Sequence, residues 1–305
     1  MLGVLSRSRH LFPWWNPMSE STDTTADQAA RRKFWTEHME RSYELLQSMT
    51  RYPAEECGEG LASIPDAAEE AGIEMLFSTS KIAGDLDRIL YIRSGLIPDL
   101  MAIARDMRER GWLLKIEDGF RTLDMQTQLG RKPAVFDMIV RTCQWELGGE
   151  PPPLDLIFRR STCLVANYPN RGTHTMGAAV DISVFSLEDG SEISRGKSYL
   201  EMSEYTPMDS PFVSPAEQEN RKAITALMER HGFLHYPGEF WHYNKGDPLY
   251  HFMAETGRPA QYNCVHWDAR TNAVTPYEDV TSPLTPPDEM AKYLAQALGR
   301  LAEEP

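Results

Sequence analysis

Apolar residues recur with two different spacings along the chain, and the two spacings predict helices and short strands. Positions about 3.6 residues apart form one face of a helix. This spacing predicts helices at residues 31–49, 98–110, 133–147, 154–163, 214–231 and 288–301, with another beginning near residue 122. Short apolar runs predict strands at residues 73–77, 112–116, 178–185, 233–236 and 239–243. The mixture predicts an α+β fold, with a single small antiparallel or mixed sheet flanked by helices.

The segments outside these elements predict the domain organisation. Residues 1–30 contain a stretch rich in Ser, Thr, Asp and Ala, which is typical of a mobile leader. We expect the main domain at residues 31–280 and a C-terminal helical extension at 281–305. The first helix would pack as an arm around the domain, or alternatively bind a partner. The loop at 191–213 lacks a clear period, and long loops beside a site are often functional.

Residues 257–285 also lack a regular period, and we expect them to be irregular. The chain's 305 residues contain 41% hydrophobic and 25% charged residues, which is typical of a globular protein. The formal net charge of -14 argues against nucleic-acid binding and against attraction to an anionic membrane. Four scattered cysteines form no CxxC pair, which argues against a thiolate metal site. No secretory signal or membrane-spanning run is evident, so we expect a cytoplasmic location. The oligomeric state is not predicted.

One polar loop leading into an apolar strand carries the first candidate chemistry. Residues 170–183 place His174 in the loop and Asp181 on the strand. Side chains alternate across a strand, so Asp181 faces away from the apolar side formed by Val180 and Ile182. A carboxylate buried there without a partner would cost several kcal/mol, on the order of 2–7. We therefore expect a cation or a strong hydrogen-bond donor beside it.

A second stretch, about sixty residues later, places Glu239 three positions before His242. On a regular strand these two would face opposite sides, but Gly238 makes a bulged approach plausible and could bring both to one site. A catalytic zinc site uses three protein ligands and leaves one position for water. His174, Asp181 and His242 are suitable ligands, and Glu239 could act as a general base on the bound water.

Arg121 follows a buried strand and could stabilise charge on a carbonyl oxygen. Each of these residues alone has a simpler interpretation. A single histidine is usually a surface or satisfied core residue, and an arginine at a helix start usually forms a salt bridge. Their joint order and spacing favours a metal site.

The order of these residues resembles a known family. His174-x-x-Gly177-x-Ala179-x-Asp181, followed by Glu239-x-Trp241-His242, is similar to the signature of the VanX-like zinc D-Ala-D-Ala dipeptidases among the M15 metallopeptidases. Asp118-Gly119-Phe120-Arg121, with Gln126 after it, resembles the family's arginine segment. The resemblance covers roughly residues 72–250.

The resemblance implies a fold of the hedgehog and D,D-peptidase type with the metal in a central cleft. It implies Zn²⁺ on His174, Asp181 and His242, one ion per chain. It also implies Glu239 as catalytic base, Arg121 as the arginine that stabilises the transition state, and a small peptide with D-configured residues as substrate.

The sequence departs from the family pattern at several positions. Gly172 stands where the family usually has serine, Met176 where it has arginine, and Thr122 where it has proline. Glu201 matches the substrate-binding acid of relatives only with a shift. These departures concern substrate recognition rather than the metal ligands.

Together the sequence predicts a zinc metallopeptidase that hydrolyses a short peptide, such as the D,D-dipeptide D-Ala-D-Ala. One alternative is a D,D- or L,D-carboxypeptidase of the same fold acting on muropeptides. A non-catalytic zinc-binding protein is another, although a merely structural site needs neither Glu239 nor Arg121 and normally closes its fourth position. A remnant with a shifted binding role is the third.

Overall fold

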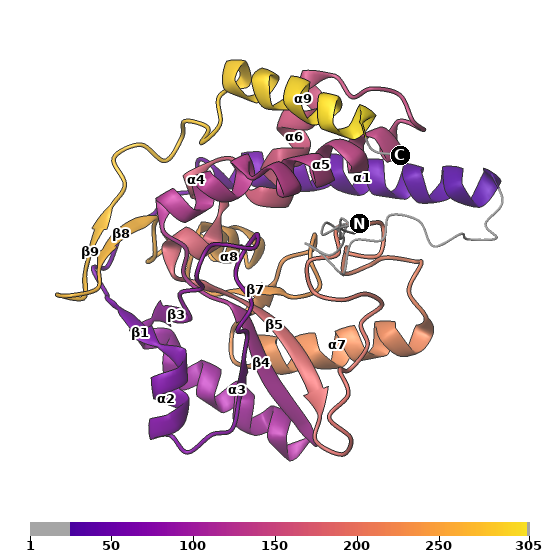
Figure 1. Ribbon diagram of the computed structural model, residues 1–305. Coiled ribbons are helices and arrows are strands. Elements are labelled where there is room, and N and C mark those ends of the chain that lie inside the picture. The colour runs from indigo at the N-terminus through magenta and orange to yellow at the C-terminus, as the bar shows by residue number, and fades with distance from the viewer. Residues whose placement is uncertain (1–24, 304–305) are drawn as a thin grey trace, which may run out of the picture.

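A five-stranded sheet lies between two groups of helices, as Figure 1 shows for the computed structural model, which describes residues 25–303. In sheet order the strands are β2 (Leu76–Phe77), β4 (Trp112–Asp118), β5 (Ala179–Ser186), β7 (His242–Asn244) and β6 (Leu234–His235). β2 runs parallel to β4, and the other neighbours are antiparallel. The predicted α+β class with one small mixed sheet flanked by helices is confirmed.

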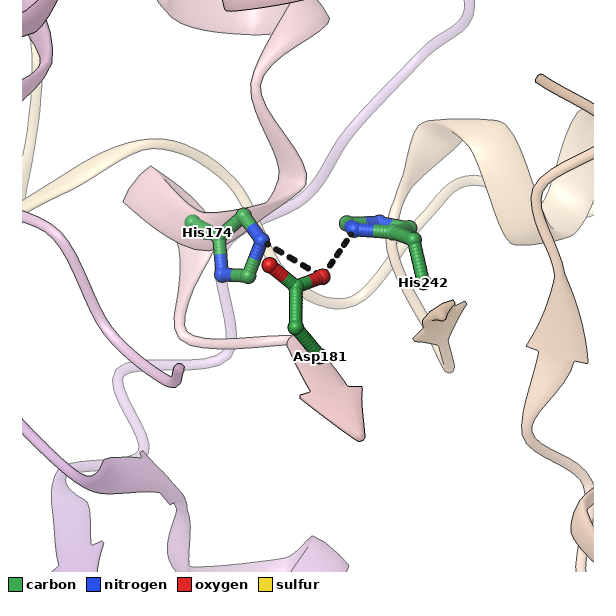
Figure 2. A group of neighbouring side chains, drawn as sticks. All are labelled: His174, Asp181 and His242. Carbon is green, nitrogen blue, oxygen red and sulfur yellow. Dashed lines mark hydrogen bonds and ion pairs between the residues drawn. The ribbon is translucent and has the colours of Figure 1, made fainter. Parts of the chain in front are cut away.

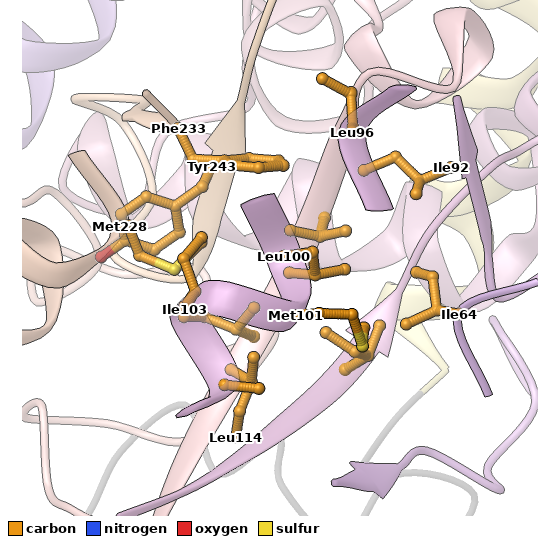
Figure 3. Close-up of a cluster of buried hydrophobic side chains, with 14 of the residues drawn as sticks. Ile64, Ile92, Leu96, Leu100, Met101, Ile103, Leu114, Met228, Phe233 and Tyr243 are labelled. Atoms are coloured by element: carbon orange, nitrogen blue, oxygen red, sulfur yellow. The ribbon is translucent and has the colours of Figure 1, made fainter. Parts of the chain in front are cut away.

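One face of the sheet forms the main hydrophobic core. Val180, Ile182 and Val184 alternate along β5 and are fully buried on this face. They pack with side chains from α2 (Ile64–Glu70), α3 (Ile97–Glu109) and α7 (Pro215–Arg230). Figure 3 shows this core, with Leu100 and Ile103 of α3 beside Leu114 of β4. Removing this apolar surface from water fixes which face of β5 points inward and which faces the opposite side.

A second group of helices covers the other side. It contains α1 (Thr25–Met49), α4 (Leu123–Arg131), α5 (Pro133–Glu146), α6 (Leu154–Val165) and α9 (Pro287–Ala302), which lie together at the top of Figure 1. Trp35, Phe136 and Ile157 are buried among them in a second hydrophobic cluster. Trp241 and Leu249, from the region beside the sheet, belong to the same cluster and join the two layers. The predicted helices are all present, with ends shifted by a few residues.

The prediction that residues 257–285 are irregular was wrong in part. β8 (Val265–Asp268) and β9 (Ala273–Pro276) form a hairpin there. Asn272 closes its turn with a positive φ of 58° and donates its backbone N–H to Asp268 O. The side chain of Trp267 packs on Tyr91 and Phe120. The short strands are stabilised by these tertiary contacts, which local periodicity does not reveal.

Several other short elements were not predicted, because they are stabilised mainly by their neighbours in space. β1 (Leu61–Ser63) pairs with β3 (Tyr91–Arg93). A one-turn 3₁₀ helix, η1 (Ser94–Leu96), leads into α3, and α8 (Pro248–Met253) is capped by the Asp247 side chain. Two further 3₁₀ turns, η2 (Pro169–Arg171) and η3 (Thr173–Met176), precede β5.

Helices lie at both ends of the described chain, within the predicted leader and the predicted C-terminal extension. α1 begins at Thr25, so residues 25–30 of the predicted leader are helical, and residues 1–24 lie outside the described residues. The predicted C-terminal extension contains α9, which packs against α5 and α6. Between residues 25 and 303, no helix combines the length and apolar composition required to cross a membrane.

Candidate metal centre and catalytic site

His174, Asp181 and His242 come together at the centre of the molecule. Their candidate ligand atoms all lie within 4.8 Å of one another, and the three side chains are buried. His174 Nε2 lies 3.3 Å from Asp181 Oδ1, and His242 Nδ1 lies 3.0 Å from the same oxygen. Figure 2 shows both imidazole rings turned towards this carboxylate. Ligand atoms at zinc-ligand distances in a tetrahedral site lie roughly 3.3–3.5 Å apart, so the spacing suits such an ion.

Local backbone structure places the two ligands of the first stretch. His174 lies in the turn η3, and Asp181 lies on β5 directly after it. Gly177 joins the two elements with a φ of 66°, and a Cβ atom there would lie 2.6 Å from Leu61 Cδ2. The sharp reversal therefore requires glycine, which explains the Gly in the His-x-x-Gly spacing. On β7, His242 pairs directly with Asp181 in the sheet register.

The second ring nitrogen of each histidine is held by an oxygen atom. His174 Nδ1 lies 2.7 Å from the carbonyl oxygen of Gly119, and His242 Nε2 lies 2.7 Å from Thr173 Oγ1. A carbonyl oxygen accepts only, so His174 Nδ1 carries the proton and Nε2 keeps its lone pair for a ligand. When His242 Nε2 donates to Thr173, Nδ1 likewise presents a lone pair towards Asp181. Histidine ligands of metals are typically oriented in this way, so the donor set fits a zinc ion.

Gly119 is itself required by close packing. A Cβ atom at this position would lie 2.8 Å from Tyr91 O and 2.9 Å from Ile89 O. The chain just after β4 therefore passes close to the start of β3, and the Gly119 carbonyl is directed at His174. This contact connects the Asp-Gly-Phe-Arg segment to the metal ligands.

Asp181 is surrounded by groups that favour its charged form. Tyr199 donates its hydroxyl to Asp181 Oδ2 at 2.9 Å, and Arg121 Nη2 lies 3.8 Å from the same oxygen. Burial alone would raise the pKa of Asp181, but with no ion bound the facing nitrogens of His174 and His242 can carry protons, and these hold this pKa well below its usual range. Burial and the charge of Asp181 raise the pKa of Tyr199, so the phenol stays protonated and remains a donor.

Glu239 reaches the same site through a turn rather than a strand. The residues between β6 and β7 form a tight reversal in which Glu239 N donates to Tyr236 O and His242 N donates to Glu239 O. The prediction of a continuous strand at 239–243 was therefore wrong, since β7 begins only at His242. The turn gives Glu239 and His242 positions on the wall of one cavity. Burial raises the pKa of Glu239 to about 7, which is suited to proton transfer near neutral pH.

Arg121 follows β4 and lines this cavity with its guanidinium group. Its Nε donates to Asp118 Oδ2 at 2.9 Å, and its Nη2 lies 2.7 Å from that oxygen. Its backbone N–H donates to His174 O at 3.2 Å. Burial opposes the charged form, but Asp118 and Asp181 outweigh burial and hold the pKa of Arg121 above its ordinary value. Arg121 therefore remains a fixed cation beside the ligand cluster.

A cavity of about 1040 Å³ opens around these groups, between the sheet and the upper helices. Polar side chains of β4 and β5, including Lys115, Glu117 and Ser183, line one side. Helical residues line the other side, and many of them, such as Val135 and Met138, are apolar. The volume lies just above the range of about 300–1000 Å³ for pockets that bind small molecules.

The structure separates Glu201 from the other predicted site residues. The neighbouring side chains Ser198, Tyr199, Leu200 and Met202 line the cavity, whereas Glu201 is absent from its lining. The Glu201 carboxylate instead lies 3.2 Å from Lys197 Nζ. Tyr199 is the residue of this loop that touches the ligand cluster. Sequence reasoning missed Tyr199 and Thr173 and gave Asp118 no role of its own, because each acts through a contact with another side chain.

Comparison with known proteins gives a match over the same region. Residues 161–264 match the model of the Peptidase_M15 family, described as D-ala-D-ala dipeptidase. The chain is 30% identical over 81 residues to the D-alanyl-D-alanine dipeptidase of Enterococcus faecalis, which is 27% of this chain and 40% of that protein. It is 34% identical over 70 residues to the D-alanyl-D-alanine dipeptidase of Escherichia coli, which is 23% of this chain and 36% of that protein.

The matched segment therefore spans about two-fifths of the length of these curated relatives. The family match over residues 161–264 includes the three clustered ligands and Glu239, but not Arg121. A solved LD-carboxypeptidase, LdcB, aligns with 62% of this chain and 73% of its own chain at 17% identity. Its TM-score of 0.33 is too low to support a conclusion.

Proposed function

We propose that this protein, whose residues 161–264 match the M15 peptidase family, is a zinc-dependent peptidase that hydrolyses short peptides. A D,D-dipeptide such as D-Ala-D-Ala is the proposed substrate, because the matching relatives are named D-alanyl-D-alanine dipeptidases. We further propose that it acts in the cytoplasm on a small peptide, without a nucleic-acid or membrane partner. The match covers residues 161–264, whereas the proposed activity, substrate and location concern the whole chain.

One observation supports this proposal above the others. Two imidazoles have their second ring nitrogens held by oxygen atoms, and both present the remaining nitrogen to one carboxylate oxygen of Asp181. Glu239 and Arg121 line the same cavity but are not part of this donor set. A structural zinc site would normally use a fourth protein ligand and would need neither residue. The arrangement therefore favours catalysis over a purely structural role.

The residues of the chain have distinct tasks in the proposed reaction. His174 Nε2, Asp181 Oδ1 and His242 Nδ1 would hold the zinc ion. When bound, zinc would polarise the peptide carbonyl and lower the pKa of a water molecule. The Glu239 carboxylate accepts a proton from the attacking water and passes it to the leaving amine nitrogen. Arg121 stabilises the negative charge that develops on the carbonyl oxygen, while Asp118 fixes the direction of its guanidinium group.

The cavity volume supports a second candidate within the same chemistry. About 1040 Å³ is far more space than two alanine residues fill, and the apolar side formed by α5 and α6 extends beyond the ligand cluster. A carboxypeptidase that trims a longer muropeptide would use this extra space. Comparing a dipeptide with a tetrapeptide of the same C-terminal sequence distinguishes the two candidates.

The proposal is tested with the purified full-length protein. Metal analysis is expected to find about one zinc ion per chain, as a three-ligand site requires. A panel of D,D-, L,D- and L,L-dipeptides, assayed by the amines released, is expected to show cleavage of D,D-peptides. Cleavage should stop with a chelator and return with zinc. Absence of zinc together with chelator-insensitive cleavage would refute the metal role, and equal cleavage of L,L-peptides would refute the stereochemical preference.

A further inference from the structure

One fully buried arginine lies outside the cavity and has no part in the proposed reaction as described so far. Arg195 follows β5 in the loop at 191–213, and it is 1% exposed. Within residues 25–303 its hydrogen bonds go to backbone carbonyls, and its Nε has no partner. Burial lowers the pKa of Arg195 below its ordinary value. A buried cation without a carboxylate partner destabilises a fold unless its other contacts offset the cost of desolvation.

The guanidinium group of Arg195 bridges two segments of the candidate site. Its Nη2 donates to Ile182 O at 2.7 Å, and its Nη1 donates to Phe240 O at 3.0 Å. Ile182 directly follows the proposed ligand Asp181, and Phe240 directly follows the proposed base Glu239. One planar group therefore connects the strand that carries a ligand to the turn that carries the base.

This bridge lies just beyond the end of the sheet. The pairing of β5 with β7 ends at Asp181 and His242, and one further backbone bond joins Ile182 N to Trp241 O at 3.0 Å. Among the described residues, no other backbone hydrogen bond holds the turn before β7 on β5. Because buried carbonyl oxygens need donors, Arg195 takes the place of the missing strand partner and extends the connection past the last pair.

A buried aromatic ring and a second arginine hold Arg195 in this place. Phe240 is fully buried, and its ring centre lies 4.8 Å from Arg195 Cζ and 4.6 Å from Arg221 Cζ. Arg221 of α7 donates its Nε to Arg195 O at 2.8 Å, and its other donors bind the carbonyls of Tyr205 and Pro207. Burial and the charge of Arg195 lower the pKa of Arg221 to about 10. The contacts with the ring offset part of the cost of burying two cations.

We propose that Arg195 is a positioning residue that holds the turn carrying Glu239 at a fixed place relative to the metal ligand Asp181. A carboxylate that transfers a proton must be held close to the water on which it acts, and a displacement of about 1 Å can lower a rate by about 100-fold. The two carbonyls bound by Arg195 belong to the residues next to the base and next to the ligand, so one rigid group sets their separation. This inference rests on the proposed function for the role of Glu239 as the base.

The experiment separates positioning from folding in the zinc-loaded full-length protein. Arg195→Met keeps a side chain of similar length but removes the charge and both donors. Arg195→Lys keeps the charge without the planar fork. Arg221→Met is the matched control, because Arg221 is similarly buried and lies against the same ring but does not donate to the turn. The measurements are steady-state kinetics with D-Ala-D-Ala, zinc competition with a chelator, urea unfolding and hydrogen exchange of backbone amides.

Arg195→Met is expected to lower kcat by about 10- to 100-fold while KM and zinc affinity stay unchanged. The amides of Glu239 and His242, which close the turn, should exchange about 10-fold faster. The Lys245 amide, which donates to Ala178 O within the strand pair, should keep its rate. Arg195→Lys should be intermediate in kcat and in exchange of the turn. Arg221→Met should keep the kcat and the turn exchange of the wild type, even where urea unfolding shows a loss of stability.

Three results would overturn the inference: wild-type kcat in Arg195→Met, unchanged exchange of the turn amides in that variant, or an equal loss of kcat in Arg221→Met. If Arg195→Met does not fold, Arg195→Lys decides, and wild-type kcat and exchange in that variant would overturn the inference. A wild type that does not hydrolyse peptides would count against the proposed function alone, because exchange of the turn amides tests the bridge without turnover.

Discussion

The hydroxyl group of Thr173 gives the sharpest test of the metal centre. Thr173 Oγ1 lies 2.7 Å from His242 Nε2, and the residue is only 3% exposed. Thr173→Val removes this acceptor while keeping a side chain of similar shape. His242 then loses the contact that holds its proton on Nε2 and its lone pair on Nδ1. We expect weaker zinc binding without loss of the fold.

The expected magnitude follows from the two states that His242 can adopt. Loss of such an orienting partner typically lowers metal affinity by about 10- to 100-fold, or about 1.4–2.8 kcal/mol. In the metal-free protein the cost is smaller. There the proton can move to Nδ1 and be donated to Asp181 Oδ1, 3.0 Å away. The substitution therefore destabilises the zinc-bound form more than the metal-free form.

Zinc affinity is measured by competition with a chromophoric chelator, and thermal unfolding is followed with and without zinc. At a fixed zinc concentration, the increase in the free energy of unfolding that zinc produces should be about 1.4–2.8 kcal/mol smaller in Thr173→Val than in the wild type. Thr175→Val is the matched control, because the Thr175 hydroxyl in the same turn donates to backbone carbonyls and does not touch a histidine. Wild-type zinc affinity in Thr173→Val, or an equal loss in Thr175→Val, would refute this reasoning.

Three further predictions concern catalysis, substrate length and stability. Glu239→Gln should lower kcat by about 10²- to 10⁴-fold and retain zinc. The kcat/KM of the wild type should rise with pH as Glu239 loses its proton. The midpoint of this rise should lie at or below the Glu239 pKa of about 7, because a bound zinc ion favours the carboxylate. A profile that is highest at pH 5, or retained turnover in the variant, would contradict this role. If the large cavity holds a longer substrate, kcat/KM for a tetrapeptide should exceed that for the dipeptide with the same C-terminus, and a clear preference for the dipeptide would exclude the second candidate. Burial raises the pKa of Asp247 to about 6, above its unfolded value, so its contribution to stability is full below about pH 4 and is lost as pH rises through about 6. Asp247→Asn, which keeps a helix-capping side chain, should therefore exceed the wild type in urea unfolding at pH 7.5 by up to about 3 kcal/mol, and a difference that does not change between pH 4 and 7.5 would argue against this cause.

Most of the larger elements could be predicted from the sequence. Long helices such as α7 carry both a capping box and an apolar face, and both signals are local. The alternation along β5 also predicted correctly that Asp181 faces away from Val180 and Ile182, which lie in the core. Several short elements, among them β1, β3 and the β8–β9 hairpin, escaped prediction. The hairpin β8–β9 depends on the packing of Trp267 against Tyr91 and Phe120, residues far away in sequence.

The amino-acid sequence alone identifies which residue types could form a metal site and in what order they occur. The side-chain types of five residues suit a catalytic metal site: His174, Asp181, Glu239, His242 and Arg121. The first two are seven residues apart because one turn and the start of one strand lie between them. The register of β5 and β7 sets the direct pairing of Asp181 with His242, and that register is a property of the folded sheet.

The surroundings of these groups depend on how the folded chain packs. This packing selected Tyr199 rather than Glu201 as the loop residue in contact with Asp181, and it assigned the Thr173 hydroxyl to His242. It also brought Arg88 to the carboxylate that Arg121 occupies. These contacts join segments that are distant along the chain, and their strength depends on burial and on distances of a few ångströms. Neither burial nor distance is encoded in the local pattern of residues, so the orientation of the ligands and the sharing of Asp118 by two arginines emerge only when the chain is folded.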